Sequence, residues 1–183
     1  TMPITKHNYI VKDVKKLAET IREAFQIARS GRPGPVLIDI PKDVTAAVTE
    51  YEPVKIDLTK PVKVLPEISE DKIKQVAEMI MAAKKPFIYA GGGIIKSNSS
   101  KELNEFATKL DIPTATSLMG IGAFDQANKL STGLIGMHGT VASNKCVVEC
   151  DLLLAFGVRF SDRVLSNHKH FAENAKIIQI DVD

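Results

Sequence analysis

From residue 69 onward, short apolar runs alternate with segments of helical periodicity, and this alternation restricts the possible folds more than any other feature of the sequence. The pattern predicts helices at 69–84, 99–110 and 141–150, strands at 87–90, 114–117, 152–156 and 177–180, and an irregular glycine-rich stretch at 118–139. Apolar strands separated by helices form a parallel sheet that is covered on both faces. We therefore expect an α/β fold with a doubly wound parallel sheet.

The first 68 residues follow a different pattern. An amphipathic helix is predicted at 13–30, with an inner face formed by Leu17, Ile21, Phe25 and Ala28. A short β-branched strand follows at 36–40, and one helix with one strand cannot bury a core unaided. Prolines and scattered charges then continue without periodicity, which indicates a stiff connector. We expect three parts: a docked N-terminal piece at 1–44, a linker at 45–68 and a domain at 69–183.

The two ends of the chain suggest a piece of a longer polypeptide. The sequence begins at Thr1 rather than Met, and it stops at Asp183 directly after the strand-like run at 176–181. The loops that follow the strands of a doubly wound sheet usually carry its function, so we expect further chain beyond this last strand.

The composition narrows the possible partners and the compartment. Hydrophobic residues make up 44% and charged residues 25% of the chain, and no apolar run approaches the roughly 18 residues of a membrane span. A net charge of +2 gives no basic field for nucleic acid. Cys146 and Cys150 lack metal-ligand neighbours, so we expect buried free thiols and no metal site. Without a leader-like segment, the expected location is the cytoplasm, with neither nucleic acid nor membrane as a partner.

Ligands of doubly wound sheets bind beyond the carboxyl ends of the strands, and the first such end holds three glycines, Gly91, Gly92 and Gly93. Glycine lets the backbone approach a ligand phosphate, but an ordinary tight turn explains the run equally well. A nicotinamide fingerprint would require a glycine where Lys96 stands and an acid near Ser117 or Leu118. A free-standing nicotinamide-binding module is therefore disfavoured.

A further strand end carries side chains suited to a nucleotide. Gly157 is followed by Arg159 and Arg163, whose guanidinium groups suit a diphosphate, although surface pairs with Asp162 or Asp181 are an equal alternative.

The loop Ile135–Gly139 holds Met137 and His138 between glycines, which allows packing against a flat ring. A purely structural turn is the commoner interpretation of such a loop. No base or nucleophile accompanies His138 in sequence, so we assign no catalytic residue.

Several motifs resemble one enzyme family. The run Gly31–Val44 resembles the end of the pyrimidine-binding domain of thiamine-diphosphate-dependent enzymes. Thr5–Asn8, Gly136–Gly139 and Gly157–Arg163 narrow the resemblance to the catalytic large subunits of acetolactate synthases, also called acetohydroxyacid synthases. The resemblance covers the whole chain.

This resemblance implies a Rossmann-like central domain at 69–183 that binds FAD without redox chemistry, preceded by a remnant of the pyrimidine-binding domain at 1–44. The parent enzyme of such a piece decarboxylates pyruvate and joins the two-carbon unit to a second 2-keto acid in branched-chain amino-acid synthesis. Its partners would be the remaining domains of the same chain, further copies in a homodimer or tetramer, and a regulatory small subunit.

The family's catalytic glutamate and its Mg²⁺ motif would lie outside this sequence, so thiamine diphosphate and Mg²⁺ are expected only in the parent. The isolated piece is expected to be inactive and to bind FAD weakly. A ligand-free spacer domain of a related enzyme is the alternative.

Carried over by resemblance, the FAD-contacting positions are Gly91, Gly92, Gly93, Ser117, Leu118, Ile135, Gly136, Met137, His138, Gly157, Arg159, Arg163, Asp181 and Val182. The family often has Asp where this chain has Ser161, so that contact is not carried over.

Overall fold

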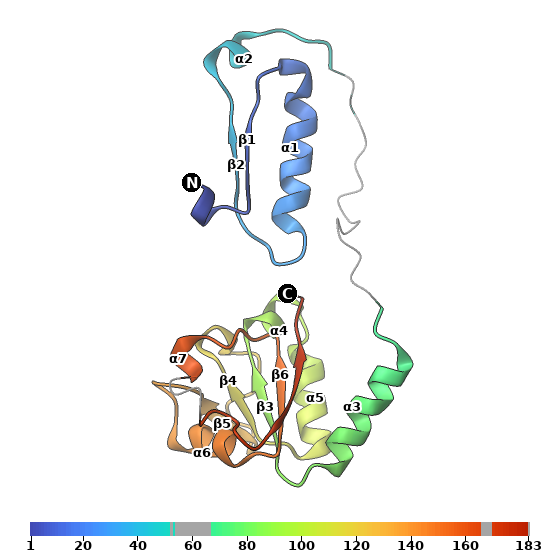
Figure 1. The fold of residues 1–183 in the computed structure, drawn as a ribbon, viewed down its shortest axis with the longest axis vertical. Helices are drawn as coiled ribbons and strands as arrows, with labels where there is room; N and C mark the ends of the chain where they lie inside the picture. Colours follow the sequence, from blue (N-terminus) through green and yellow to red (C-terminus); the bar gives the residue numbers. More distant parts are fainter. Residues whose placement is uncertain (52, 54–66, 166–169, 183) are drawn as a thin grey trace. The chain divides into compact units, whose positions relative to one another are not determined.

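The computed structural model describes residues 1–51, 53, 67–165 and 170–182 (Figure 1). The chain divides into two compact units, one formed by Thr1–Pro66 together with Val182–Asp183 and the other by Glu67–Asp181. Most of the predicted linker 45–68 lies outside the described residues. Each unit is described separately.

The N-terminal unit is a βαβ arrangement with a short 3₁₀ turn before it and a short helix after it. Its elements are η1 (Met2–Ile4), β1 (His7–Ile10), α1 (Val14–Arg29), β2 (Val36–Asp39) and α2 (Lys42–Ala46). The two strands are parallel, with His7 opposite Val36 and Ile10 opposite Asp39. Asp13 caps α1, since its carboxylate accepts a hydrogen bond from the Lys15 amide at 3.0 Å.

Two sequence-based expectations for this unit differ from the structure. Strand β1 was not predicted, because its four residues include His and Asn and do not alternate clearly. Phe25, expected on the inner face of the helix, is 60% exposed, and the neighbouring Ala24 is buried instead.

The larger unit contains the expected parallel sheet. Its elements are α3 (Glu70–Ala82), β3 (Pro86–Ala90), α4 (Gly92–Lys96), α5 (Ser100–Leu110), β4 (Thr114–Thr116), η2 (Leu118–Gly120), β5 (Ser131–Leu134), α6 (Val141–Glu149), β6 (Leu152–Phe156), α7 (Asp162–Leu165) and β7 (Lys176–Ile180). The strand order is β5-β4-β3-β6-β7, and all four neighbouring pairs are parallel. The predicted α/β class is confirmed.

Strand β5 lies inside the stretch that was expected to be irregular. Its residues, Ser131–Leu134, are mostly polar and include Gly133 at φ +90°, so no apolar run marks it in the sequence. The register with β4 also shifts between Thr114 and Ala115. The strand is fixed by its pairing with β4, a tertiary contact that local sequence does not encode.

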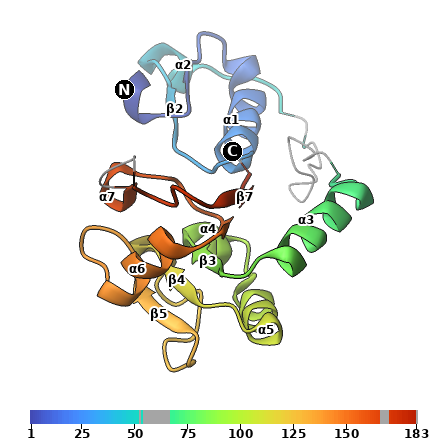
Figure 2. The same ribbon diagram turned by 60° about the horizontal axis from the view of Figure 1, so that its bottom comes forward.

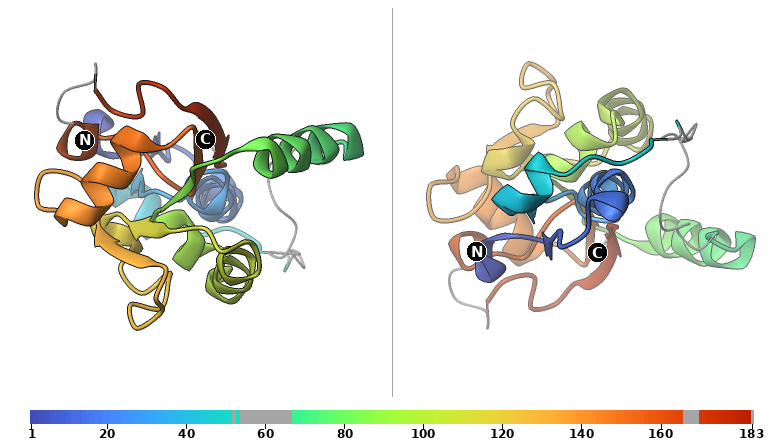
Figure 3. Two further views of the ribbon diagram at one scale, coloured as in Figure 1. Left: turned by 90° about the horizontal axis from the view of Figure 1, so that it is seen from below. Right: turned by 90° about the horizontal axis from the view of Figure 1, so that it is seen from above.

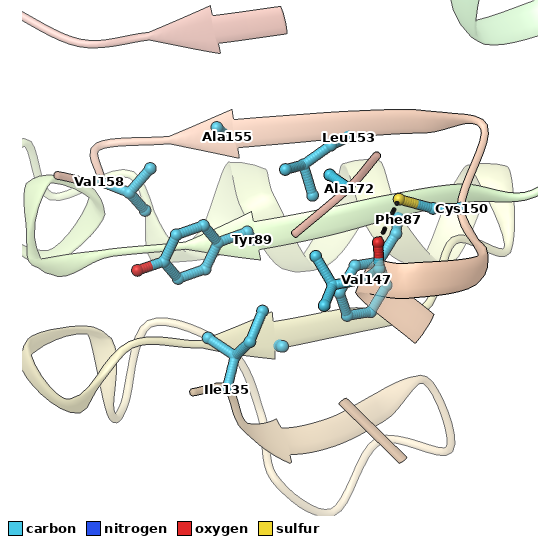
Figure 4. Packing of buried hydrophobic residues seen from close by; sticks show 10 residues of the cluster. Phe87, Tyr89, Ile135, Val147, Cys150, Leu153, Ala155, Val158 and Ala172 are labelled. Atoms are coloured by element: carbon cyan, nitrogen blue, oxygen red, sulfur yellow. Dashed lines mark hydrogen bonds between the residues drawn. The ribbon is translucent and has the colours of Figure 1, made fainter. Parts of the chain in front are cut away.

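Helices cover both faces of the sheet, as Figures 2 and 3 show for this unit. Along β3, Phe87 and Tyr89 face the side of α6, while Ile88 and Ala90 face the side of α5. The first cluster, drawn in Figure 4, contains Phe87, Tyr89, Ala115, Ile135, Val147, Cys150, Leu153, Ala155, Val158 and Ala172. The second contains Ile88, Ala90, Leu103, Ala107, Ile112, Ala123, Phe124, Leu130, Leu152 and Leu154.

Helix α3 covers less of the sheet than expected. None of its residues is buried, and Ile73 near its start is 56% exposed. Only the carboxyl end of the helix, at Met79 and Ile80, packs against the second cluster. Figure 1 shows the rest of α3 extending away from the sheet. Among the described residues, no helix combines the length and apolar character needed to cross a membrane.

Candidate functional site

The predicted site residues of the larger unit gather at one edge of the sheet. Because the five strands are parallel, their carboxyl ends and the loops that follow lie on the same side. The chain forms β3, β4 and β5 in one direction and then places β6 and β7 on the other side of β3. The strand order therefore reverses between the neighbouring strands β3 and β6. This is the topological switch point, where doubly wound folds bind ligands. This edge is the candidate site.

At the switch point, the loops after β3 and β6 are in direct backbone contact. The Gly91 amide donates to the Phe156 carbonyl at 2.9 Å, and the Gly93 amide donates to the Gly157 carbonyl at 3.0 Å. A Cβ on Gly91 would lie 2.2 Å from the Gly157 oxygen, and a Cβ on Gly93 would lie 2.5 Å from the Gly157 Cα. The close approach that demands glycine here is between two loops, so these two amides are not donors for a phosphate.

The middle glycine of the run, Gly92, approaches the loop after β4. A Cβ on Gly92 would lie 2.9 Å from the carbonyl oxygen of Met119. A five-residue helix, α4, begins at Gly92, before the helix that the sequence predicted from residue 99.

The loop after β4 presents apolar side chains at the edge. Ser117 donates its amide to the Ala90 carbonyl at 2.9 Å, which ties the loop to β3. Leu118 is 69% exposed and Met119 is 72% exposed. Sequence reasoning named Leu118 but missed Met119, although two large apolar residues directly after a strand were a visible signal. Their exposure suits contact with an apolar ligand surface or another domain.

The loop after β5 has a buried base and an exposed tip. Ile135 is buried in the first cluster, whereas Met137 and His138 are exposed. Gly136 has φ +104°, a conformation that favours glycine. The Met137 amide donates to the Arg163 carbonyl at 3.0 Å, which joins this loop to the start of α7. Sequence spacing gave no sign of this link.

Arg159 and Arg163 are both exposed on the segment after β6. The alternative that they pair with surface carboxylates is not seen in the described part of the chain, where neither guanidinium forms an ion pair. Asp162 instead accepts the backbone amide of Arg163 at 2.9 Å. Ser161 shapes the same turn, since its carbonyl accepts the amides of Val164 and Leu165.

The last two predicted residues follow β7. Asp181 is exposed and ends the larger unit, and Val182 is the next residue along the chain, with 52% of its surface exposed.

The cysteines have no feature of a reactive centre. Both thiols are free, and the Cys150 thiol donates to the Val147 carbonyl at 3.3 Å. Burial raises the pKa of Cys150 to about 11, and burial together with Glu149 raises the pKa of Cys146. Cys150 is buried as expected, while Cys146 is partly exposed. Within the described ranges, no three His, Cys, Asp or Glu side chains are grouped as metal ligands.

Comparison with known proteins identifies the class. The sequence model of the thiamine pyrophosphate enzyme central domain matches residues 73–183, and the chain belongs to this family. Over its whole length the chain is 48% identical to the "Probable acetolactate synthase large subunit" of Methanocaldococcus jannaschii and 45% identical to the "Acetolactate synthase isozyme 1 large subunit" of Escherichia coli K12. It is also 46% identical to the "Acetolactate synthase, chloroplastic" of Arabidopsis thaliana.

These matches confirm the resemblance that the sequence motifs indicated. They cover 31%, 32% and 27% of the three relatives, so the chain spans about a third of their length.

Proposed function

We propose that the chain is the central part of an acetolactate synthase large subunit and that residues 69–183 bind FAD in a non-redox role. The full-length enzyme would decarboxylate pyruvate and join the two-carbon unit to a second 2-keto acid. Alignment of the whole chain with about a third of each relative supports the placement. Residues 1–44 would then complete the preceding pyrimidine-binding domain through the β1–β2 pair.

The observation that carries the FAD proposal is the pair of unpaired guanidinium groups, Arg159 and Arg163, beside the switch point. Guanidinium groups bind diphosphate with paired, charge-assisted hydrogen bonds. Exposed apolar side chains on the same edge, including Leu118 and Met137, suit a flat ring. The donor set therefore fits a dinucleotide that carries both a diphosphate and an aromatic ring.

In this proposal the chain holds FAD in a structural role and supplies no reacting group. His138 has no hydrogen-bonded base or acid among the described residues, and the cysteine thiols are protonated at neutral pH because their pKa values are raised. Thiamine diphosphate and Mg²⁺ would be held by other parts of the full-length subunit. Assembly into a dimer or tetramer, a regulatory small subunit and a cytoplasmic location belong to the same proposal.

The test is flavin retention by the full-length subunit. We expect FAD to copurify with the wild type, and Arg159→Ala to weaken FAD binding by about 1–3 kcal/mol, the value of a charged hydrogen bond. Arg29→Ala is the matched control, because Arg29 is an exposed arginine at the end of α1 in the other unit. Equal retention in both variants would contradict the role of Arg159, and a wild type without affinity for FAD would contradict the site.

A ligand-free spacer is the second candidate function, and one observation favours it. The Gly91 and Gly93 amides donate to carbonyl groups of the protein itself, so neither is left to bind a phosphate. A full-length subunit that synthesises acetolactate at the same rate with and without added FAD would support the spacer.

A further inference from the structure

Tyr89 lies at the base of the candidate site and was not among the predicted site residues. It is the fourth residue of β3, two positions before Gly91, and its side chain is 1% exposed. Figure 4 shows its ring between Ile135 and Val158, with the hydroxyl directed toward the carboxyl end of the strand. The strand thus points a phenol group at the edge where the loops gather.

The ring is held by residues that belong to the site loops. Ile135 directly precedes Gly136, and Val158 directly follows Gly157. Phe160 packs edge-on against Tyr89, with the ring centroids 6.2 Å apart. The ring of Tyr89 is therefore held by the loops after β5 and β6.

The Tyr89 hydroxyl has no hydrogen-bond partner among the described residues, and burial alone raises its pKa to about 12. The group is a neutral O–H at physiological pH, able to donate and to accept. Buried hydroxyls are nearly always hydrogen-bonded, so an exception calls for a partner that the chain does not provide.

A second tyrosine provides a comparison. Tyr9 lies on β1 of the other unit, and burial together with the Glu23 carboxylate raises its pKa. The pKa of Tyr89 is raised by burial alone, without such a carboxylate. Tyr9 therefore has an acidic neighbour within the chain, whereas the Tyr89 hydroxyl is directed at the carboxyl edge of the sheet.

We propose that Tyr89 is a ligand-contact residue at the floor of the site, where its hydroxyl donates a hydrogen bond to an oxygen of the bound flavin nucleotide. This inference rests on the proposed FAD function and adds a donor from the strand itself. In this arrangement Arg159 and Arg163, on the loop after β6, bind the diphosphate of the nucleotide. The Tyr89 hydroxyl binds the nucleotide from β3 and so sets how close it lies to that strand.

The experiment compares FAD binding and stability in Tyr89→Phe, made in the full-length subunit stripped of flavin. Phe fills the same volume and removes only the hydroxyl. We expect the dissociation constant for FAD to rise about 3- to 10-fold, the effect of one neutral hydrogen bond. The melting temperature of the flavin-free protein should stay the same or rise, because an unsatisfied polar group has been removed. Tyr9→Phe is the matched control, with unchanged FAD affinity.

Each other result has a definite meaning. If the wild type binds FAD and Tyr89→Phe binds it equally well, water satisfies the hydroxyl and the inference is wrong. If affinity falls together with the melting temperature of the flavin-free variant, Tyr89 acts through folding, which also overturns the inference. A wild type that does not bind FAD contradicts the proposed function itself, before the variant is measured.

Discussion

Asn144 and Gly136 form a two-way hydrogen-bonded pair. The Gly136 amide donates to Asn144 Oδ1 at 3.0 Å, and Asn144 Nδ2 donates to the Gly136 carbonyl at 3.0 Å. Asn144 belongs to α6, and Gly136 belongs to the loop after β5. One side chain on a regular helix therefore provides the acceptor for the Gly136 amide and a second donor, beside the Gly139 amide, for its carbonyl, and it holds the loop that carries Met137 and His138.

Asn144→Ala should loosen this loop. The amide of Gly136, a buried residue, loses its partner, and its carbonyl keeps only the Gly139 amide, which together cost about 1–3 kcal/mol of unfolding free energy. Urea unfolding measures the loss, and FAD affinity of the full-length subunit should fall in parallel. Asn144→Asp is the informative companion, because it keeps the acceptor for the amide and replaces the donor with a charge beside a carbonyl. If both variants unfold like the wild type, the pair does not hold the loop.

Asp151, which directly precedes β6, forms hydrogen bonds that link the amino ends of β6 and β3. Its carboxylate accepts the Lys84 amide at 2.7 Å and the Lys85 amide at 2.9 Å, and its backbone carbonyl accepts the Lys176 amide at the start of β7. The two amide hydrogen bonds lower the pKa of Asp151 below its ordinary value of 3.8. The ionised carboxylate is thus favoured in the folded state.

Asp151→Asn should make stability less dependent on pH in the acid range. A carboxyl whose folded-state pKa is lowered stabilises the fold above the unfolded-state pKa, and this contribution is lost as the pH falls through the folded-state value. The wild type should therefore lose stability below about pH 4 more steeply than the variant. Unfolding curves from pH 7 to 2.5 measure this. Glu105→Gln, which removes an exposed carboxylate paired only with Lys101 on the same helix, should leave the slope unchanged.

The sequence predicts this fold well where each element is encoded locally. Strand β3 is an apolar run that ends at glycine, and α3 begins directly after Ser69, whose hydroxyl accepts the Lys72 amide. Such signals lie within a few residues of the elements they specify. The family resemblance rests on similarly local runs, such as the one after Gly157.

The elements that sequence reasoning missed depend on partners far along the chain. Strand β5 is polar and gains its conformation from pairing with β4, and β1 gains its conformation from β2. The role of Asn144 depends on a contact eight residues away across a loop, and that of Tyr89 on two loops that meet above the strand. No period in the sequence reports contacts of this kind.

Gly157 offers the sharpest test of how the switch point is built. It has φ +58°, and a Cβ there would lie 2.6 Å from the Cα of Gly93. In Gly157→Ala the alanine must adopt a left-handed backbone conformation, which costs about 1–2 kcal/mol. Its methyl group must also push the loops after β3 and β6 apart, which costs about 1–3 kcal/mol more. We expect a total loss of about 2–5 kcal/mol in urea unfolding of this unit.

Gly122→Ala separates the two costs of the Gly157 variant. Gly122 has φ +92°, further from the left-handed minimum than Gly157, but a Cβ there meets no atom within 4 Å. Its substitution therefore bears at least the same backbone strain without a clash. The loss for Gly157→Ala should exceed that for Gly122→Ala, and the excess measures how tightly the loops after β3 and β6 are packed. Equal losses would mean that these loops separate without cost, leaving the backbone contact between Gly93 and Gly157 unable to define the shape of the site.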